Sequence, residues 1–271
     1  MLAVARHRLL FTKTGRAKYL SHLDLMRTVQ RVFARAGVGI RHTEGFNPHA
    51  YVSVALPLSV GVESVCELLD FEVVDGTPLA TLPELLNANL PEGIAVLDAY
   101  EAETKLKDIA FLRVRGTFTY DNAVVGRDAP GALCVSSTAA LSDTCIGGIP
   151  RVSSTAALSD TCTGAPRASR PTRAVVEELS AFFSQPSILV RKLTKKKKET
   201  EVDIKPLIRE ISFTADGANR VTLEAVLAAQ NPGLNPSLLL EALRQHVSEI
   251  VPDFAQFARV EVYDKDMQVF R

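Results

Sequence analysis

The chain has 271 residues, 46% of them hydrophobic, and equal numbers of acidic and basic side chains. That is enough apolar material for a soluble globular fold of one large or two small domains without stabilising disulfides. No apolar run approaches the ~20 residues of a membrane span, and Arg6 and Arg8 interrupt the one near the start, so we expect a cytoplasmic protein without a signal peptide.

The zero net charge hides an asymmetry along the chain. Residues 1–61 carry nine Lys/Arg and two Asp/Glu, a formal charge of +7, and the remainder carries −7. A basic face of this kind attracts anionic partners, of which RNA is the obvious candidate. The four cysteines show no CxxC or CxxxCxxC spacing, so we expect no metal site, no iron–sulfur cluster and no other cofactor.

The first third of the chain alternates strand-like and helix-like patterns. Ser21 with Asp24 three residues later forms a capping-box pattern at the start of an amphipathic helix, and Gly37 ends it. A second helix is expected from Thr77 as its cap and Pro78 as its first residue. The helical spacing predicts a core-facing stripe of Leu23, Met26, Val29, Phe33 and Ala36. Strands are predicted at residues 6–14, 52–55, 63–74 and 93–103.

The resulting order, β-α-β-β-α-β, is that of a ferredoxin-like module, in which two helices cover one face of an antiparallel sheet. The rest of the chain repeats this order, with a hairpin turned by Asp216 and Gly217 and a last helix capped by Asn235. We therefore expect an α+β protein of two tandem ferredoxin-like modules, at residues 1–104 and 109–271. Predicted strands cover residues 110–120, 187–194, 209–228 and 257–270, and predicted helices cover 172–185 and 235–247.

A low-complexity insertion interrupts the second module at about residues 122–171. The stretch "VSSTAALSDTC" occurs at 135–145 and again at 152–162, in a context rich in Ser, Thr, Ala and Gly. Two copies are too few for a solenoid, and this composition cannot bury a core. We interpret the segment as a duplicated, disordered insertion.

Basic side chains gather around the predicted turn at Thr14-Gly15, just before the first helix. Lys13, Arg16 and Lys18 surround this turn, next to the N-terminal end of the helix. Backbone N–H groups at a helix N-terminus together with basic side chains make a possible phosphate site, although the glycine spacing is not that of a P-loop. The alternative is a solvated turn before a well-capped helix. Arg27, Arg31 and Arg35 follow along the helix, away from its apolar stripe.

Three histidines lie on either side of the same helix. His22 is its first residue, and His42, Asn47 and His49 lie in the loop that follows it, together with Glu44. Such groups can serve as general acids and bases or as contacts to a ligand. The helix separates His22 from the loop by about 25 Å, so a common site requires the loop to fold back.

A second basic run contributes Lys195, Lys196, Lys197 and Lys198. Runs of like charge are commonly solvated loops, but this one could also contact phosphates, and its affinity would then depend steeply on salt. Aromatic side chains are scarce nearby, so the sequence does not favour stacking on bases there.

Three motifs, "FTKTGRAKYLSHLDLMR", "EGFNPHAYVSVALPLSVGVES" and "KKKKETEVDIKPLI", together resemble the bacterial radical-SAM-linked protein family, catalogued as domain of unknown function 2344. Ala50 and Tyr51 depart from it, because a proline and a basic residue are expected there. The residues that match its pattern are Ser21, His22, Asp24, Gly45, Phe46, Asn47, Pro48, Pro57 and Gly61.

The resemblance implies a stand-alone module whose partner is a radical SAM protein, without a cluster motif of its own. Together with the basic N-terminal portion, it leads to a first hypothesis of an accessory, non-catalytic module that binds RNA or a ribosomal component. One alternative is a ferredoxin-like RNA-processing enzyme that uses His22 and His49, or His42, as acid and base. Another is a protein–protein adaptor that docks through the acidic second module.

Overall fold

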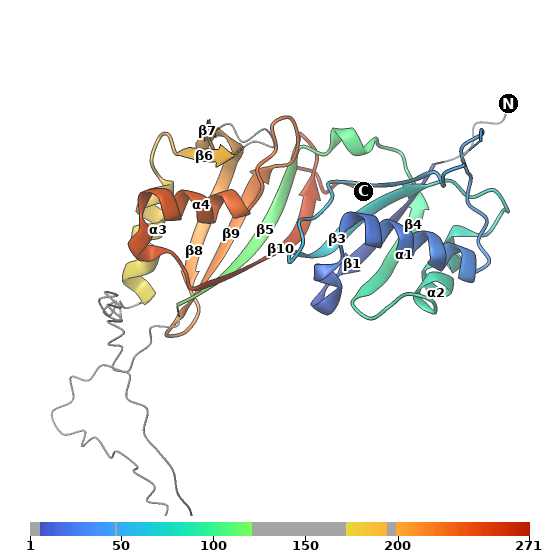
Figure 1. Ribbon diagram of the computed structural model, residues 1–271, viewed down its shortest axis with the longest axis horizontal. Helices are drawn as coiled ribbons and strands as arrows, with labels where there is room; N and C mark the ends of the chain where they lie inside the picture. Colours follow the sequence, from blue (N-terminus) through green and yellow to red (C-terminus); the bar gives the residue numbers. More distant parts are fainter. Residues whose placement is uncertain (1–5, 47, 121–171, 194–198) are drawn as a thin grey trace, which may run out of the picture.

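The computed structural model describes residues 6–46, 48–120, 172–193 and 199–271 (Figure 1). Over these ranges the chain is a mixed α+β protein with four α-helices, one mostly antiparallel eight-stranded sheet and a separate two-stranded sheet. The predicted α+β class is therefore confirmed. None of the helices in the described part is long and apolar enough to cross a membrane. The predicted insertion at 122–171 lies outside the described residues.

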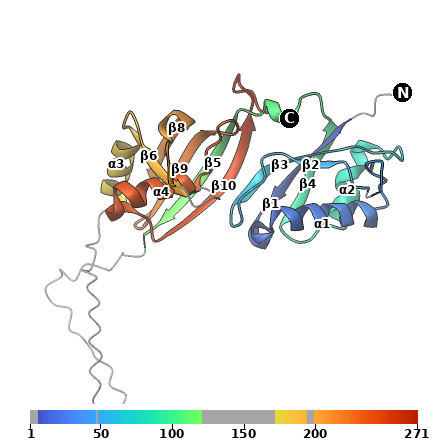
Figure 2. The same cartoon turned by 45° about the horizontal axis from the view of Figure 1, so that its top comes forward.

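The first half, residues 6–101, has the predicted order of strand, helix, strand, strand, helix, strand. Its strands pair antiparallel in the order β4-β1-β3, with the short β2 on the outer side of β3. Helices α1 and α2 lie against one face of these strands (Figures 1 and 2). The elements are β1 (His7–Lys13), α1 (His22–Arg35), β2 (Val52–Val54), β3 (Glu63–Phe71), α2 (Leu82–Asn87) and β4 (Ile94–Glu101).

Helix α1 begins where the capping pattern predicts. The Ser21 hydroxyl accepts a hydrogen bond from the backbone N–H of Asp24, and Gly37 follows the helix with a φ of 72°, a conformation that glycine adopts without strain. The predicted core stripe is wrong at Leu23, which is 64% exposed. The buried residues are Leu25, Val29, Val32 and Phe33, so the buried face is rotated relative to the predicted one.

The second predicted helix of this half is shorter than expected. A 3-10 turn, Leu79–Thr81, comes first, and α2 begins only at Leu82, so Thr77 does not cap it. The Thr77 hydroxyl instead donates to the Asp75 carboxylate at 2.6 Å. That contact keeps Thr77 in the loop after β3.

The second half has the strand order β10-β5-β9-β8, also antiparallel, with β6 and β7 paired as a separate hairpin. The predicted turn at Asp216-Gly217 connects β8 to β9. Asn235 accepts a hydrogen bond from Ser237 N at 3.0 Å just before α4 begins. The elements are β5 (Phe111–Thr119), α3 (Thr172–Phe183), β6 (Leu189–Leu193), β7 (Glu199–Asp203), β8 (Ile208–Ala215), β9 (Arg220–Ala228), α4 (Ser237–His246) and β10 (Phe254–Tyr263).

The two halves meet where β10 pairs in parallel with the start of β3. Only Glu63 and Ser64 of β3 take part, opposite Ala258 and Arg259. Strand β3 contributes side chains to two hydrophobic cores. Leu69 and Phe71 pack with α1 and α2, whereas Cys66 and Leu68 pack with the apolar side chains of the second half.

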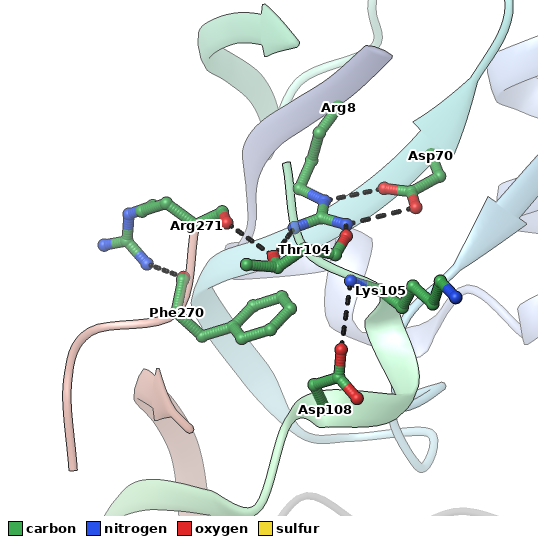
Figure 3. Close-up of polar contacts among 7 residues, drawn as sticks. All are labelled: Arg8, Asp70, Thr104, Lys105, Asp108, Phe270 and Arg271. Atoms are coloured by element: carbon green, nitrogen blue, oxygen red, sulfur yellow. Dashed lines mark hydrogen bonds and ion pairs between the residues drawn. The ribbon is translucent and has the colours of Figure 1, made fainter. Parts of the chain in front are cut away.

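A buried arginine joins the first half to the connector and to the last residues described. Arg8, in β1, is fully buried and donates two hydrogen bonds to Asp70, at 2.6 and 3.1 Å (Figure 3). It also donates to the side-chain and backbone oxygens of Thr104, and its guanidinium lies 5.0 Å from the ring centroid of Phe270. Thr104 in turn donates to the backbone oxygen of Arg271. These contacts cover the face of β1 and β3 that the helices leave free.

Candidate functional site

The loop after α1 forms a hairpin that turns back on itself. The backbone N–H of Thr43 donates to the carbonyl of His49 at 2.7 Å, and His49 N donates to the Thr43 hydroxyl at 2.8 Å. One step further from the tip, Tyr51 N donates to the carbonyl of Arg41. These bonds bring the two arms together and place residues 44–48 at the tip, with Asn47 outside the described residues. The arms meet at the C-terminal end of α1 (Figure 1).

A pocket of about 310 Å³ lies between this hairpin and the last two turns of α1. We call it the hairpin pocket. Its apolar lining includes Ala34, Ile40 and Pro48, and its polar lining consists of the side chains of Gln30, His42 and His49. The fold thus brings His42 and His49 to one site.

His22 does not line the hairpin pocket. It is exposed at the first position of α1, and the pocket reaches back along the helix only as far as Gln30. Eight residues separate the two positions, about 12 Å of helix. The hairpin folds back along α1 only as far as Gln30. The structure therefore does not place His22 in a common pocket with His49, as the predicted acid–base pair would require.

The polar groups of the pocket are available for a ligand. His42 places Nδ1 2.9 Å from the carbonyl of Ile40, so in the neutral ring Nδ1 carries the proton and Nε2 is a free acceptor. The side chains of Gln30 and His49 have no hydrogen-bond partner among the described residues. No Asp or Glu lines the pocket. It is therefore polar but uncharged when the histidines are neutral.

Two acidic residues hold the pocket wall in place. Asp75 accepts hydrogen bonds from the hydroxyl of Thr77, from Gly39 N and from Thr77 N, which hold the pKa of its carboxyl below the usual range. Glu72 pairs with Arg41 at 2.9 Å, and the Arg41 guanidinium lies 4.8 Å from the ring centroid of Tyr51. The first arm is therefore anchored to the segment that follows β3, and the second arm is held to the first through Arg41.

The tip of the hairpin exposes an aromatic ring. Phe46 is fully exposed, although phenylalanine is normally among the more buried residues. The sequence identified this position only as part of the matching motif and did not predict a free ring. A second exposed aromatic, Tyr19, is 65% exposed and lies just before the other end of α1.

The predicted basic stripe of α1 is exposed. The only acidic side chain within ion-pair distance of Arg27 in the described part is Asp24, at 3.5 Å and itself half exposed. Arg31 and Arg35 have no ion-pair partner there. Residues three apart on a helix are neighbours, so Arg27 lies beside Gln30 and Arg31 beside Ala34, both of which line the hairpin pocket.

The other predicted phosphate site, around Thr14-Gly15, has one cation that is free of acidic partners in the described part of the chain. Lys13 is 1% exposed and donates to the carbonyl of Leu20 at 2.9 Å, and burial lowers its pKa. Its side chain does not reach the surface turn, because it extends inward from β1. Lys18 pairs with Glu63 at 3.1 Å. Only Arg16 is exposed without an ion-pair partner among the described residues. Lys195, Lys196, Lys197 and Lys198 lie outside those residues.

A further cleft of about 970 Å³ lies between the connector, the second half and the last residues of the chain. Its charged lining consists of Lys107, Lys265 and Arg271 against Asp108 and Asp264, next to the Arg8 cluster of Figure 3. Arg271 is paired with Glu261 at 2.9 Å, which leaves two lining charges of each sign. Within the described ranges no group of three or more His, Cys, Asp and Glu side chains is placed to hold a metal ion.

The comparisons with known proteins identify a family but no function. A search of curated proteins found no match to the chain. The family described as an uncharacterized protein conserved in bacteria, domain of unknown function 2344, matches residues 6–236, which include both α1 and the hairpin pocket. The chain therefore belongs to this bacterial family, as its three motifs predicted.

Proposed function

We propose that this protein binds RNA along α1, as an accessory module of a radical SAM enzyme. The observation that carries the proposal is the exposed stripe of Arg27, Arg31 and Arg35, which is neutralised only in part, by Asp24. An aromatic side chain is exposed near each end of the helix, Tyr19 at one and Phe46 at the other. Basic side chains that follow a backbone, together with rings on which bases stack, are the elements of single-stranded nucleic-acid binding.

We also infer that each half is a ferredoxin-like unit. The orders β4-β1-β3-β2 and β10-β5-β9-β8 place corresponding strands in corresponding positions, and each half contributes two helices. Units of this kind frequently bind RNA, an argument from fold analogy alone. The α1 surface adds the residue-level argument.

The proposed radical SAM partner is supported by the family resemblance of the three motifs. Co-purification from the native host tests it. If the tagged protein recovers a radical SAM protein together with RNA, the accessory role is supported. Recovery of that protein without RNA would favour the adaptor alternative. Recovery of neither would remove the partner from the proposal.

The RNA-binding part is tested by charge reversal on α1. We expect wild-type protein to bind tRNA or rRNA fragments with an affinity that falls steeply as salt increases. The triple variant Arg27→Glu/Arg31→Glu/Arg35→Glu should bind at least about tenfold more weakly at low salt. The binding constant of this variant should also depend less steeply on salt. The slope of its logarithm against the logarithm of salt concentration should be about 2 smaller in magnitude, because each lost phosphate contact to a single strand removes ~0.7.

A matched control separates the helix from the overall charge. Arg173, Arg191 and Arg244 of the second half are also exposed, and each has an acidic partner within 4 Å. Reversing these three changes the net charge by the same amount. If both triple variants lose the same affinity, or if wild-type protein shows no saturable binding, the proposal fails.

The hairpin pocket favours a second candidate, an RNA-processing enzyme. It brings His42 and His49 together, so these two, rather than the predicted pair that includes His22, would act as acid and base. Under this reading His49→Ala abolishes turnover of a bound RNA while binding survives, and His22→Ala has little effect. The accessory role requires that wild-type protein leave the RNA unchanged.

A further inference from the structure

The hairpin pocket differs in charge from the helix surface next to it. The exposed stripe of α1 is cationic, whereas the lining of the pocket contains no carboxylate, lysine or arginine. A ligand that fits both surfaces has an anionic part beside a neutral, polar part. A nucleotide has this distribution of charge, with its phosphate next to a neutral base.

The spacing along α1 puts the two parts at neighbouring positions. Arg27 and Gln30 are three residues apart, as are Arg31 and Ala34, so each pair has Cβ atoms about 5–6 Å apart. Gln30 and Ala34 line the pocket, and both arginines are exposed beside it. A phosphate held by an arginine of the stripe therefore lies within one nucleotide of the pocket.

The lining of the pocket suits the edge of a base. The amide of Gln30 offers a donor and an acceptor, and Nε2 of His42 offers an acceptor, because its Nδ1 already contacts Ile40. Apolar side chains, among them Ala34 and Pro48, form the remaining lining. The volume of about 310 Å³ is at the small end of the ~300–1,000 Å³ of small-molecule sites.

We propose that the hairpin pocket receives one unpaired base of the bound RNA, whose flanking phosphates lie on Arg27 and Arg31. This inference rests on the proposed function and adds the element that it recognises, a single unstacked nucleotide. The exposed ring of Phe46 is placed at the hairpin tip to stack on a neighbouring base. Gln30 and His42 then decide which base enters.

The test compares RNA with a polymer that has no bases. Short single-stranded RNAs of equal length, each with one kind of base, are titrated against a base-free ribose-phosphate polymer of the same length and charge. Wild-type protein should bind at least one RNA about tenfold more tightly than the base-free polymer. The ratio of the two affinities is the readout, because contacts to phosphate contribute equally to both.

Two variants assign the effect to the pocket. Ala34→Leu fills it from an exposed helix position, so the fold is retained and the affinity ratio should fall to the smaller value that stacking on Tyr19 and Phe46 leaves, with the salt slope unchanged. Ala181→Leu, at an exposed position of α3, is the matched control and should leave the ratio unchanged. Gln30→Ala keeps the space open and should alter the preference among the bases.

The outcomes separate this inference from the RNA-binding proposal. If the base-free polymer binds as tightly as every RNA, or if Ala34→Leu behaves like Ala181→Leu, the base pocket is wrong while RNA binding along α1 stands. If no polymer binds, both are wrong. The pocket is supported if the ratio of RNA affinity to base-free polymer affinity falls in Ala34→Leu but not in Ala181→Leu, and if Gln30→Ala changes the preference among the bases.

Discussion

Arg259 of β10 donates a hydrogen bond from Nη1 to Oε1 of Glu67 in β3 at 2.9 Å, across the boundary between the two halves. The two side chains are 8% and 0% exposed, and a second guanidinium nitrogen of Arg259 donates to the carbonyl of Leu56 at 2.7 Å. The other carboxylate oxygen, Oε2, has no hydrogen-bond partner among the described residues. The carboxylate therefore depends on Arg259 for its principal neutralising contact.

We expect Arg259→Met to lower the free energy of unfolding by about 3–5 kcal/mol, because it leaves the charge of Glu67 buried without its partner. Urea denaturation measures the loss. The exposed pair Arg115–Glu224 provides the control, and Arg115→Met should cost at most ~1 kcal/mol. Replacing Glu67 and Arg259 together by Met should cost less than Arg259→Met alone. Equal costs for the buried and the exposed arginine would contradict the role of the pair.

Arg8→Lys tests the cluster of Figure 3 without changing its charge. Lysine cannot reproduce the paired hydrogen bonds to Asp70 or reach both oxygens of Thr104. We expect a loss of about 2–3 kcal/mol in the free energy of unfolding. The matched substitution Arg31→Lys, on the exposed face of α1, should change stability by less than ~0.5 kcal/mol. If the two variants are equally stable, the Arg8 contacts contribute little.

Asp75 should make the anchoring of the hairpin pocket dependent on pH. Its folded-state pKa is lowered by hydrogen bonds from Thr77 and Gly39, so its contribution to stability is present above the unfolded value of about 3.9 and is lost as pH falls through the lowered one. Asp75→Asn should thus be less stable than wild type at pH 7, and the difference should shrink below pH ~4. Thermal unfolding across this range measures it. A difference that does not depend on pH would show that the carboxylate charge is not involved.

Cys66 should be chemically inert in the folded protein. Its side chain is buried, and burial raises the pKa of the thiol to about 12, so almost no thiolate is present at pH 8. Peptide mapping after iodoacetamide treatment should find this cysteine unlabelled in native buffer and labelled in urea. Rapid native labelling would mean that β3 opens readily.

The sequence predicts the local structure well because the local signals are strong. Ser21, Asp24 and Gly37 mark both ends of α1, and Asp216-Gly217 marks the turn between β8 and β9. It fails for Leu23 because two apolar rows run along the helix, and only packing against the sheet decides which one is buried. The pairing of β3 with β10 involves residues more than 190 apart, and no local pattern indicates it.

The site is predicted only in part for a similar reason. The motif around His49 and the arginines of α1 are visible in the sequence, but their relationship depends on the direction in which the hairpin folds back. The sequence suggests that Lys13 is a surface cation, but its position in β1 directs its side chain into the interior. Gln30 carries no signal other than its position three residues after Arg27, so its place in the pocket emerges only from the fold.

Strand β3 carries Leu69 into one core and Leu68 into the other, and its outer edge is shared between β2 and β10. A break in the connector between the halves would therefore not release two self-sufficient parts, because the first would expose Leu68 to water and the second would lose a neighbour of β10. One half placed alone in another protein would need a new neighbour for this strand. The two halves should accordingly diverge in step, with substitutions on one side of β3 compensated on the other.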